Sequence, residues 1–200
     1  MQKDFFKNKS NDYEKDKNRV NNVQNIADAI LNEIHFTKSM NIIDFGSGTG
    51  LLLEKIAPFV KKITAIDMSS SMNKKLDEKR ELLDCELEIL EIDLIQTKLE
   101  HKFDSIISSM TLHHIKDIEN LFKIFYNLLN TNGTIALADL DIEDGSFHME
   151  DTGVHHFGFD RNQIVNIAKK AGFKNIKIRS ASVALKPHGD YPIFLLTGKR

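Results

Sequence analysis

The sequence contains little of what marks a secreted or membrane-spanning protein. Its 200 residues include a single cysteine, Cys85, which excludes an internal disulfide and is typical of a reducing compartment. No apolar run approaches the roughly 20 residues that a transmembrane helix needs, and the charged N-terminal stretch lacks the apolar core of a signal peptide. We therefore expect a cytoplasmic protein without a membrane span, an expectation that rests on missing signals.

A surplus of positive charge is also missing. The chain has 27 basic and 29 acidic residues, for a formal net charge of -2, so its overall charge does not favour a polyanionic partner. A nucleic-acid-binding protein can be basic in one region only, and the balance weakens that class without excluding it. With 41% hydrophobic and 28% charged residues, the composition is typical of one globular domain, here residues 1–200.

Helical and extended apolar patterns alternate along most of the chain. Strands are predicted at 42–45, 62–66, 87–92, 103–108 and 134–140, and helices at 20–34, from 51 to near Pro58, at 69–83 and at 115–129. This alternation predicts a parallel sheet with helices on both faces, and strands that are apolar on both sides agree with burial at its centre. The expected fold class is α/β: a Rossmann-like, doubly wound sheet in three layers.

The two ends of the chain depart from this pattern. In the tail, Asp160 predicts the start of a helix and Gly172 its end. Strands are then expected at 173–179 and 191–197, and they should pair antiparallel because no helical pattern separates them. Residues 1–19 are polar with a few aromatics, and are expected to form either a mobile arm or a lid over a site.

A glycine-rich loop follows the first predicted strand, in the segment IIDFGSGTG. Glycines after a strand and before a helix let the backbone approach a ligand and aim free amide groups at it. The dinucleotide fingerprint requires GxGxxG, and Leu51 stands where its third glycine would be; the Gly-Lys-Ser/Thr of a P-loop is missing too. The loop thus favours a small nucleoside ligand without a diphosphate, although a tight strand-to-helix turn alone would also need glycines. The loop residues predicted to contact the ligand are Gly46, Ser47, Gly48, Thr49 and Gly50.

Acidic residues follow three successive strands. Asp44 is expected to accept hydrogen bonds from loop amides or from a ligand's ammonium group. Asp67 stands where doubly wound proteins hold ribose hydroxyls, with capping of the next helix as its plainer role, and Met68 beside it either packs in the core or flanks an adenine ring. Asp93, with the backbone of Leu94 nearby, is a candidate partner for the adenine amine, and an exposed loop acid is the alternative.

Five segments in order, IIDFGSGTG, TAIDMS, EIDL, FDSIISSMTLHHI and LLNTNGTIALAD, resemble the successive motifs of class I S-adenosylmethionine (SAM)-dependent methyltransferases. The nearest resemblance is to the small-molecule branch that includes the ubiquinone/menaquinone and "type 11" methyltransferases, and it covers about residues 20–198. It implies a seven-stranded sheet of order 3-2-1-4-5-7-6 with strand seven antiparallel. It also implies that Asp44 and the glycines hold the methionine part of SAM, Asp67 the ribose and Asp93 the adenine amine.

The crevice of a doubly wound sheet lies where the strand order reverses, here between the strands at 42–45 and 103–108. Ser108 ends the second of these strands and is a candidate cofactor contact. His113 and His114 follow it and are candidate general bases, because the pKa of histidine lies near neutrality. The alternative is a loop pair that packs against or caps the next helix.

A second histidine pair lies in FHMEDTGVHHFGFDR, residues 147–161, which should cross above the same crevice. We rank three interpretations: a substrate-binding cap, then a plain loop, then a metal site using imidazole and carboxylate. Metal binding is ranked last because adjacent histidines lack the helical spacing of strong zinc motifs, and no metal site is predicted. His156 is retained as a third candidate base. The residues of this segment that carry chemistry are His148, Glu150, Asp151, His155 and His156.

Together these features predict SN2 transfer of the SAM methyl group to a small molecule, releasing S-adenosylhomocysteine. One alternative is a non-catalytic SAM-binding module. Another is a methyltransferase acting on nucleic acid or protein; it is disfavoured because Ser108-Ser109-Met110-Thr111 stands where amino-methylating nucleic-acid enzymes carry Asn/Asp-Pro-Pro-aromatic. The glycine spacing disfavours a nicotinamide-dependent reductase. The sequence does not indicate the methyl acceptor or the oligomeric state.

Overall fold

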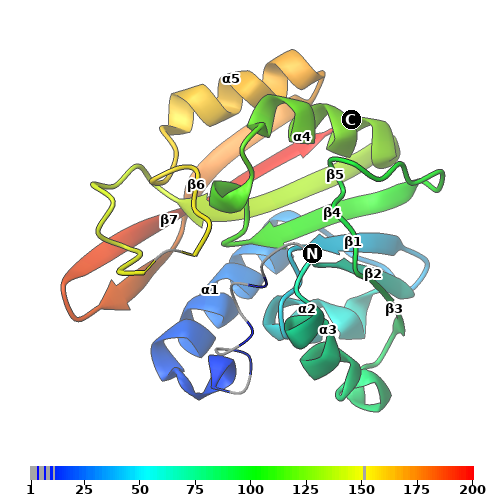
Figure 1. Cartoon of the computed structure of the whole chain (residues 1–200). Helices are drawn as coiled ribbons and strands as arrows, with labels where there is room; N and C mark the ends of the chain where they lie inside the picture. Colours follow the sequence, from blue (N-terminus) through cyan, green and yellow to red (C-terminus); the bar gives the residue numbers. More distant parts are fainter. Residues whose placement is uncertain (1–3, 5–6, 8–9, 11, 151) are drawn as a thin grey trace.

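The computed structural model describes residues 4, 7, 10, 12–150 and 152–200. Its strands form one seven-stranded sheet in the order β3-β2-β1-β4-β5-β7-β6, with β7 antiparallel to both of its neighbours (Figure 1). The fold class, the strand order and the direction of strand seven are thereby confirmed. The strands are β1 (Asn41–Phe45), β2 (Lys62–Ile66), β3 (Glu86–Leu90), β4 (Phe103–Ser109), β5 (Leu129–Leu140), β6 (Lys174–Lys186) and β7 (Gly189–Lys199).

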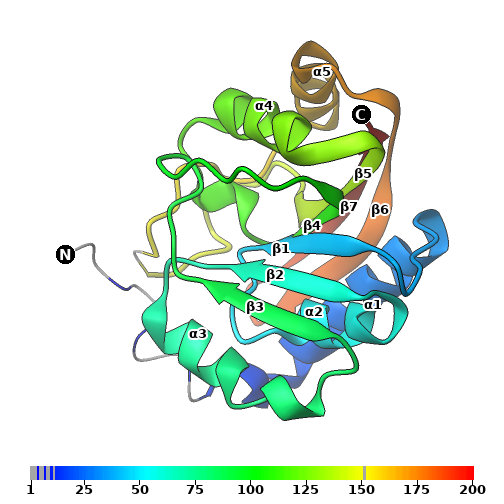
Figure 2. The same cartoon turned by 90° about the vertical axis from the view of Figure 1, so that its right-hand side faces the viewer.

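Helices cover both faces of the sheet. On one face lie α1 (Lys17–Glu33), α2 (Leu51–Ile56) and α3 (Ser70–Asp77); on the other lie α4 (Ile118–Leu128) and α5 (Arg161–Ala171) (Figures 1 and 2). Successive strand residues point to opposite faces, so Ile42 packs in the core under α1 and α2. Ile43 packs in the core under α4 and α5. The continuous apolar runs in the sequence reflect this burial on both sides.

Several element boundaries differ from the sequence expectation. The helix predicted at 69–83 ends at Asp77, and a short 3-10 turn, Arg80–Leu82, follows it. The helix predicted from 115 begins at Ile118, because the Asp117 carboxylate accepts the Asn120 amide at 3.0 Å and caps it. The strand predicted at 134–140 begins earlier, at Leu129, and within it Asn132 takes a left-handed backbone with φ of 65°.

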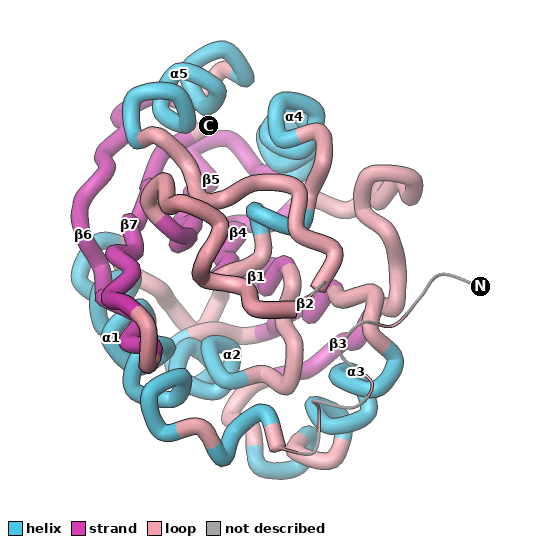
Figure 3. The backbone as a smooth tube through the Cα atoms, turned by 60° about the vertical axis from the view of Figure 1, so that its left-hand side comes forward, coloured by secondary structure: helices cyan, strands magenta, loops and turns pink. Residues whose placement is uncertain are grey.

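The tail strands pair antiparallel as predicted, and they are longer than the patterns at 173–179 and 191–197 indicated. They reach Lys186 and Gly189 and enclose only Pro187 and His188. The far end of this hairpin extends past the sheet toward the carboxyl ends of β1 and β4. Figure 3 shows loops crossing in front of those two strands.

The N-terminal segment lies against this same end of the sheet. Tyr13–Lys15 forms a 3-10 turn, and the Asp16 side chain accepts two amides at the start of α1. Residues 1–3, 5–6, 8–9 and 11 lie outside the described residues, so the expectation of a mobile arm or lid stays a prediction. Within the described part of the chain, no helix combines the length and apolar character that crossing a membrane requires.

Candidate functional site

A cavity of about 610 Å³ opens at the carboxyl ends of β1 and β4, where the strand order reverses. Its volume falls within the roughly 300–1,000 Å³ of small-molecule sites. The floor is the glycine loop and the segment after β4. The walls come from three segments far apart in sequence: residues 13–23, residues 147–150 with Thr152, and residues 184–188.

The glycine loop shapes the floor through two different constraints. Gly46 has φ of 70°, and a Cβ built on it would lie 2.1 Å from the Thr111 hydroxyl oxygen, so a larger residue would collide with the segment after β4. Gly48, with φ of 53°, would place a Cβ in open space with nothing within 4 Å. The first glycine is required for packing, and the second leaves backbone exposed to the cavity.

Asp44 is a buried carboxylate at the end of β1 that borders the cavity. The residue is 1% exposed, and among the described residues its Oδ2 atom has no hydrogen-bond partner. Burial, followed by the neighbouring charge of Asp67, raises the pKa of Asp44 to about 8. A buried, unpaired carboxylate is costly unless a cation or donor completes it, so this atom suits a ligand's ammonium group.

Other buried polar atoms around the loop share this feature. Within the described residues, four further cavity-lining side chains carry a buried polar atom without a hydrogen-bond partner: Asn22, Ser47, Thr49 and Ser109. Buried polar groups in folded proteins are normally satisfied. Ser47, Thr49 and Ser109 belong to the floor and Asn22 to the α1 wall, and together they fit a polar ligand such as the methionine part of SAM.

Asp67 lies next to the glycine loop but does not line the cavity. Its carboxylate accepts the backbone amides of Gly48 and Ser69, each at 2.8 Å, and burial raises its pKa. Each oxygen retains a further lone pair, so the amides position the group and leave capacity for ribose hydroxyls. Met68 is 42% exposed and is not packed in the core. A side chain that flanks a ligand ring needs such an exposed position.

The structure gives three other predicted cofactor contacts local roles. The two oxygens of Asp93 accept the Ile95 amide at 2.9 Å and the Gln96 side chain at 2.6 Å. The Leu94 side chain is buried in the core. Ser108 is buried and donates to the Phe45 carbonyl at 2.7 Å; because side chains alternate along a strand, it is Ser109 that faces the cavity.

His113 lies on a 3-10 turn, Leu112–His114, directly after β4. It is 1% exposed, and its Nδ1 lies 2.6 Å from Oδ1 of Asp139, which is fully buried near the end of β5. Asp139 also accepts the His113 amide at 3.3 Å and the Leu140 amide at 2.7 Å. A carboxylate on Nδ1 keeps the proton there and leaves Nε2 with its lone pair.

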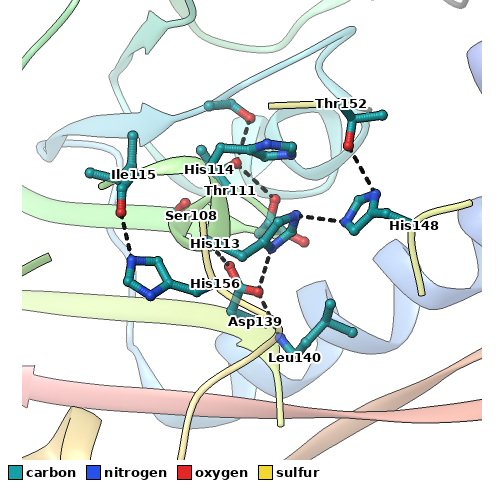
Figure 4. Close-up of polar contacts among 12 residues, drawn as sticks. Ser108, Thr111, His113, His114, Ile115, Asp139, Leu140, His148, Thr152 and His156 are labelled. Carbon is teal, nitrogen blue, oxygen red and sulfur yellow. Dashed lines mark hydrogen bonds and ion pairs between the residues drawn. The ribbon is translucent and has the colours of Figure 1, made fainter. Parts of the chain in front are cut away.

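Two further imidazoles meet His113 in the cavity (Figure 4). The Nε2 atoms of His148 and His113 are 3.3 Å apart, and His148 Nδ1 lies 3.1 Å from the Thr152 hydroxyl. The His114 ring packs against that of His113 with centroids 4.3 Å apart. Burial, helped by the charge of neighbouring histidines, lowers the pKa of His114 to about 4 and that of His148 to about 3.

His156 does not join this cluster, although it was a candidate base. Its Nε2 lies 2.9 Å from the Ile115 carbonyl oxygen, its ring packs on Phe159, and it does not line the cavity. The backbone amides of His155 and His156 both donate to the His113 carbonyl, at 2.9 and 3.1 Å. The His155–His156 pair therefore anchors the segment 147–161 to the His113 turn through its backbone. The histidine of this segment that lines the cavity is His148.

Sequence reasoning did not single out Asp139 or pair His148 with His113. One signal for Asp139 was available, because an aspartate inside the apolar run TIALADL requires a buried partner. Nothing in the sequence indicates that this partner is His113, since the contact joins residues from different elements. Asp151, which the sequence grouped with the histidines, lies outside the described residues.

A comparison with protein-family models identifies the class. The model described as "methyltransferase domain" matches residues 19–178, and the chain belongs to this family. An uncharacterized methyltransferase of Schizosaccharomyces pombe is 31% identical over 170 residues, which are 76% of this chain and 60% of that protein. The chain thus spans about three fifths of the length of this relative.

Two solved structures share the fold. Phosphoethanolamine N-methyltransferase 2 of Haemonchus contortus, bound to phosphomonomethylethanolamine and S-adenosylhomocysteine, matches with a TM-score of 0.73 and 18% identity, over 88% of this chain and 52% of that chain. Magnesium protoporphyrin IX methyltransferase of Synechocystis, with bound SAM, matches with a TM-score of 0.67 and 17% identity, over 92% and 80%. The chain therefore contains a methyltransferase domain of the class I SAM-dependent type, and solved structures of this fold bind SAM or S-adenosylhomocysteine. The resemblance, the enzyme class and the cofactor predicted from the sequence are confirmed.

Proposed function

We propose that this domain methylates a small molecule that binds in the cavity beside the cofactor. One observation carries the proposal: the same cavity is lined by Asp44, with its unpartnered oxygen, and by the imidazoles of His113 and His148. Three segments wall it in, so the accessible space suits a small acceptor better than a folded macromolecule or a duplex.

The glycine loop and Asp44 hold the cofactor in this proposal. Asp44 receives the ammonium group, and the exposed backbone at Gly48 allows the methionine part to lie against the loop. Asp67, positioned by two amides, accepts the ribose hydroxyls. We retain Asp93 and Leu94 for the adenine, and Met68 beside the ring. Bound SAM supplies a methyl group on a sulfonium leaving group, so the chain's own task is to place the acceptor and to exclude water.

The acceptor's reacting atom is proposed to lie beside the histidine cluster. An oxygen, nitrogen or sulfur nucleophile that carries a proton needs to lose it as the methyl group arrives. We assign that proton to His113, because Asp139 holds its Nδ1, and its Nε2, which His148 contacts at 3.3 Å, is the nitrogen left to accept a proton. His114 lies beside it as a second candidate. The position of His156 outside the cavity removes it from this role in the proposal.

Binding of SAM to the purified chain, measured by titration calorimetry, tests the cofactor half. We expect saturable binding, weakened on the order of 10- to 100-fold in Asp67→Ala, which removes two charge-assisted acceptors from the ribose. Asp84→Ala, a change at an exposed ion pair with Lys38, is the matched control and should bind as the parent does. Equal binding by parent and Asp67→Ala would remove the ribose assignment.

The acceptor half is tested by incubating the chain with SAM and a metabolite extract, and by searching for masses increased by one methylene. RNA, DNA and unfolded protein are offered in parallel at several salt concentrations, because contacts to phosphates weaken as salt rises. Methylation confined to the small-molecule fraction is the expected result. Methylation of a macromolecule would overturn the proposed acceptor class, and SAM binding without any turnover would favour a non-catalytic module.

A further inference from the structure

Three histidines from two separate segments converge on one point of the cavity. His113 and His114 follow β4, and His148 comes from the segment after β5. One ring nitrogen of each lies within 4.8 Å of the others. We propose that these three side chains form a binding site for a divalent transition-metal ion of the zinc type, adjoining the place of methyl transfer. Imidazole is a favoured ligand for such ions.

The spacing of two of the nitrogens already matches a metal site. Ligand nitrogens about 2.0–2.1 Å from a tetrahedral zinc ion lie roughly 3.3–3.4 Å from each other. The Nε2 atoms of His113 and His148 are 3.3 Å apart. The nitrogen of the half-buried His114 lies within 4.8 Å of the other two, so completing the triad requires it to move closer to them when the ion binds.

The Nδ1 atom of each ring also has the kind of contact that is usual in histidines that bind metals. Histidines that bind metals nearly always place their other nitrogen against a carboxylate, a carbonyl or water, which fixes the tautomer and raises basicity. Asp139 holds Nδ1 of His113 at 2.6 Å, the Gly153 carbonyl lies 3.4 Å from Nδ1 of His114, and the Thr152 hydroxyl lies 3.1 Å from Nδ1 of His148. The supporting groups come from two parts of the chain, the end of β5 at Asp139 and the adjacent residues Thr152 and Gly153.

A metal-free explanation accounts for two of the rings. The Thr152 hydroxyl can donate to His148, whose Nε2 proton then lies on His113, whose Nδ1 proton lies on Asp139. In the metal-bound arrangement the ion replaces the proton between the two Nε2 atoms. Because a hydroxyl both donates and accepts, Thr152 can turn to support the other tautomer of His148. In the metal-free arrangement His114 contacts the Gly153 carbonyl through Nδ1, and the metal site adds its other nitrogen to those of His113 and His148.

Three protein nitrogens leave a tetrahedral ion with an open position, which is the arrangement of catalytic rather than structural zinc. This part of the inference rests on the proposed function: the open position faces the cavity and would take a water molecule or the acceptor's oxygen, nitrogen or sulfur. The same Nε2 lone pair of His113 cannot hold a metal and accept a proton. The metal site therefore assigns His113 as a ligand instead of a base.

Metal binding can be measured without knowing the acceptor. The full chain is freed of metal with a chelator, dialysed, and titrated with Zn²⁺ against a chromophoric competitor; Co²⁺ is then added for its visible absorption. We expect one ion per chain. We expect His148→Ala and His114→Ala each to lower the affinity by more than roughly 100-fold, since loss of a supporting residue alone costs roughly 10- to 100-fold. Asp139→Asn should fall in that smaller range.

His101→Ala is the matched control, because His101 is exposed and does not line the cavity; it should bind Zn²⁺ as the parent does. Thermal melts and SAM calorimetry show whether each variant is folded. Zn²⁺ binding that is absent in the parent, or unchanged in both His148→Ala and His114→Ala, would overturn the metal site. If the chelated chain nevertheless binds SAM and methylates a small molecule, the proposed function stands while this inference fails.

Discussion

One end of the cavity is lined by a buried carboxylate, that of Asp44, and the other end is backed by a second one, that of Asp139 behind the His113 ring; the two are held in opposite ways. Asp44, at the end of β1, leaves Oδ2 without a partner among the described residues. Asp139, near the end of β5, accepts the His113 ring, the His113 amide and the Leu140 amide. The first end is incomplete without a ligand. The second is complete within the protein and serves to orient a side chain.

The difference separates binding from positioning in physical terms. An unpaired buried carboxylate destabilises the fold and gains by meeting a cation, so selection for ligand binding accounts for its presence. A carboxylate with three donors repays its desolvation inside the fold, so its effect is transmitted through His113. The substitutions Asp44→Asn and Asp139→Asn should therefore affect SAM affinity and the stability of the fold differently.

The largest expected effect is on cofactor affinity. Asp44→Asn removes the charge that the SAM ammonium group would meet in a site shielded from water, and should weaken SAM binding by on the order of 100-fold. Asp139→Asn should change it by less than about threefold, because its contacts lie at the other end of the cavity. Calorimetric titration of both variants decides the matter. If the two lose affinity equally, the division between a binding end and a positioning end is wrong.

The next effect is on the stability of the ligand-free protein, and it has opposite signs in the two variants. The folded state keeps the Asp44 proton up to about pH 8, whereas an unfolded aspartate loses its proton near its ordinary value of about 4, so stability falls as pH rises between these values. Asp44→Asn cannot ionise and should raise the free energy of unfolding at about pH 8 by roughly 2 kcal/mol or more. Asp139→Asn leaves donors mismatched and should lower it by roughly 1–3 kcal/mol.

Urea unfolding at about pH 5 and about pH 8 measures both changes. The gain in Asp44→Asn should shrink at the lower pH, where the parent carboxyl is protonated as well. A variant less stable than the parent at the higher pH would show that Asp44 is already satisfied within the fold.

The smallest effect is the pH dependence of cofactor binding. The ammonium group needs an ionised Asp44, so raising the pH from about 6 to about 7.5 should strengthen SAM binding roughly tenfold in the parent. The rise should be missing in Asp44→Asn. It should also be missing for methylthioadenosine, which has the nucleoside but no amino-acid part. A similar rise for methylthioadenosine would assign the dependence to another group, such as Asp67.

The glycine loop and its neighbours show how far the sequence alone could lead. Strand, glycine spacing and the acids at 44 and 67 are consecutive in the chain, and the constraints on them are local, so their positions could be predicted. The direction of β7 could be predicted as well, since no helical pattern separates it from β6. The length of the tail strands could not, because it depends on pairing between residues distant in sequence.

The histidine cluster marks where local reasoning stops. The sequence presents two adjacent pairs, His113-His114 and His155-His156, and treats each pair as a unit. The fold instead selects both members of the first pair, neither ring of the second, and the single His148. Which histidines meet depends on how the segment after β5 crosses β4. This is a tertiary contact, and it cannot be predicted from the spacing of residues in the sequence.

The hydrogen bonds from the His155 and His156 amides to the His113 carbonyl link two segments that are far apart in sequence. They tie the segment after β5 to the turn that carries His113, so a displacement of this segment would pull on the contact between His113 and Asp139. The segment after β5 and the turn that carries His113 are thus coupled to each other. We therefore expect cofactor and acceptor to enter on the side formed by residues 13–23 and the tip of the β6–β7 hairpin.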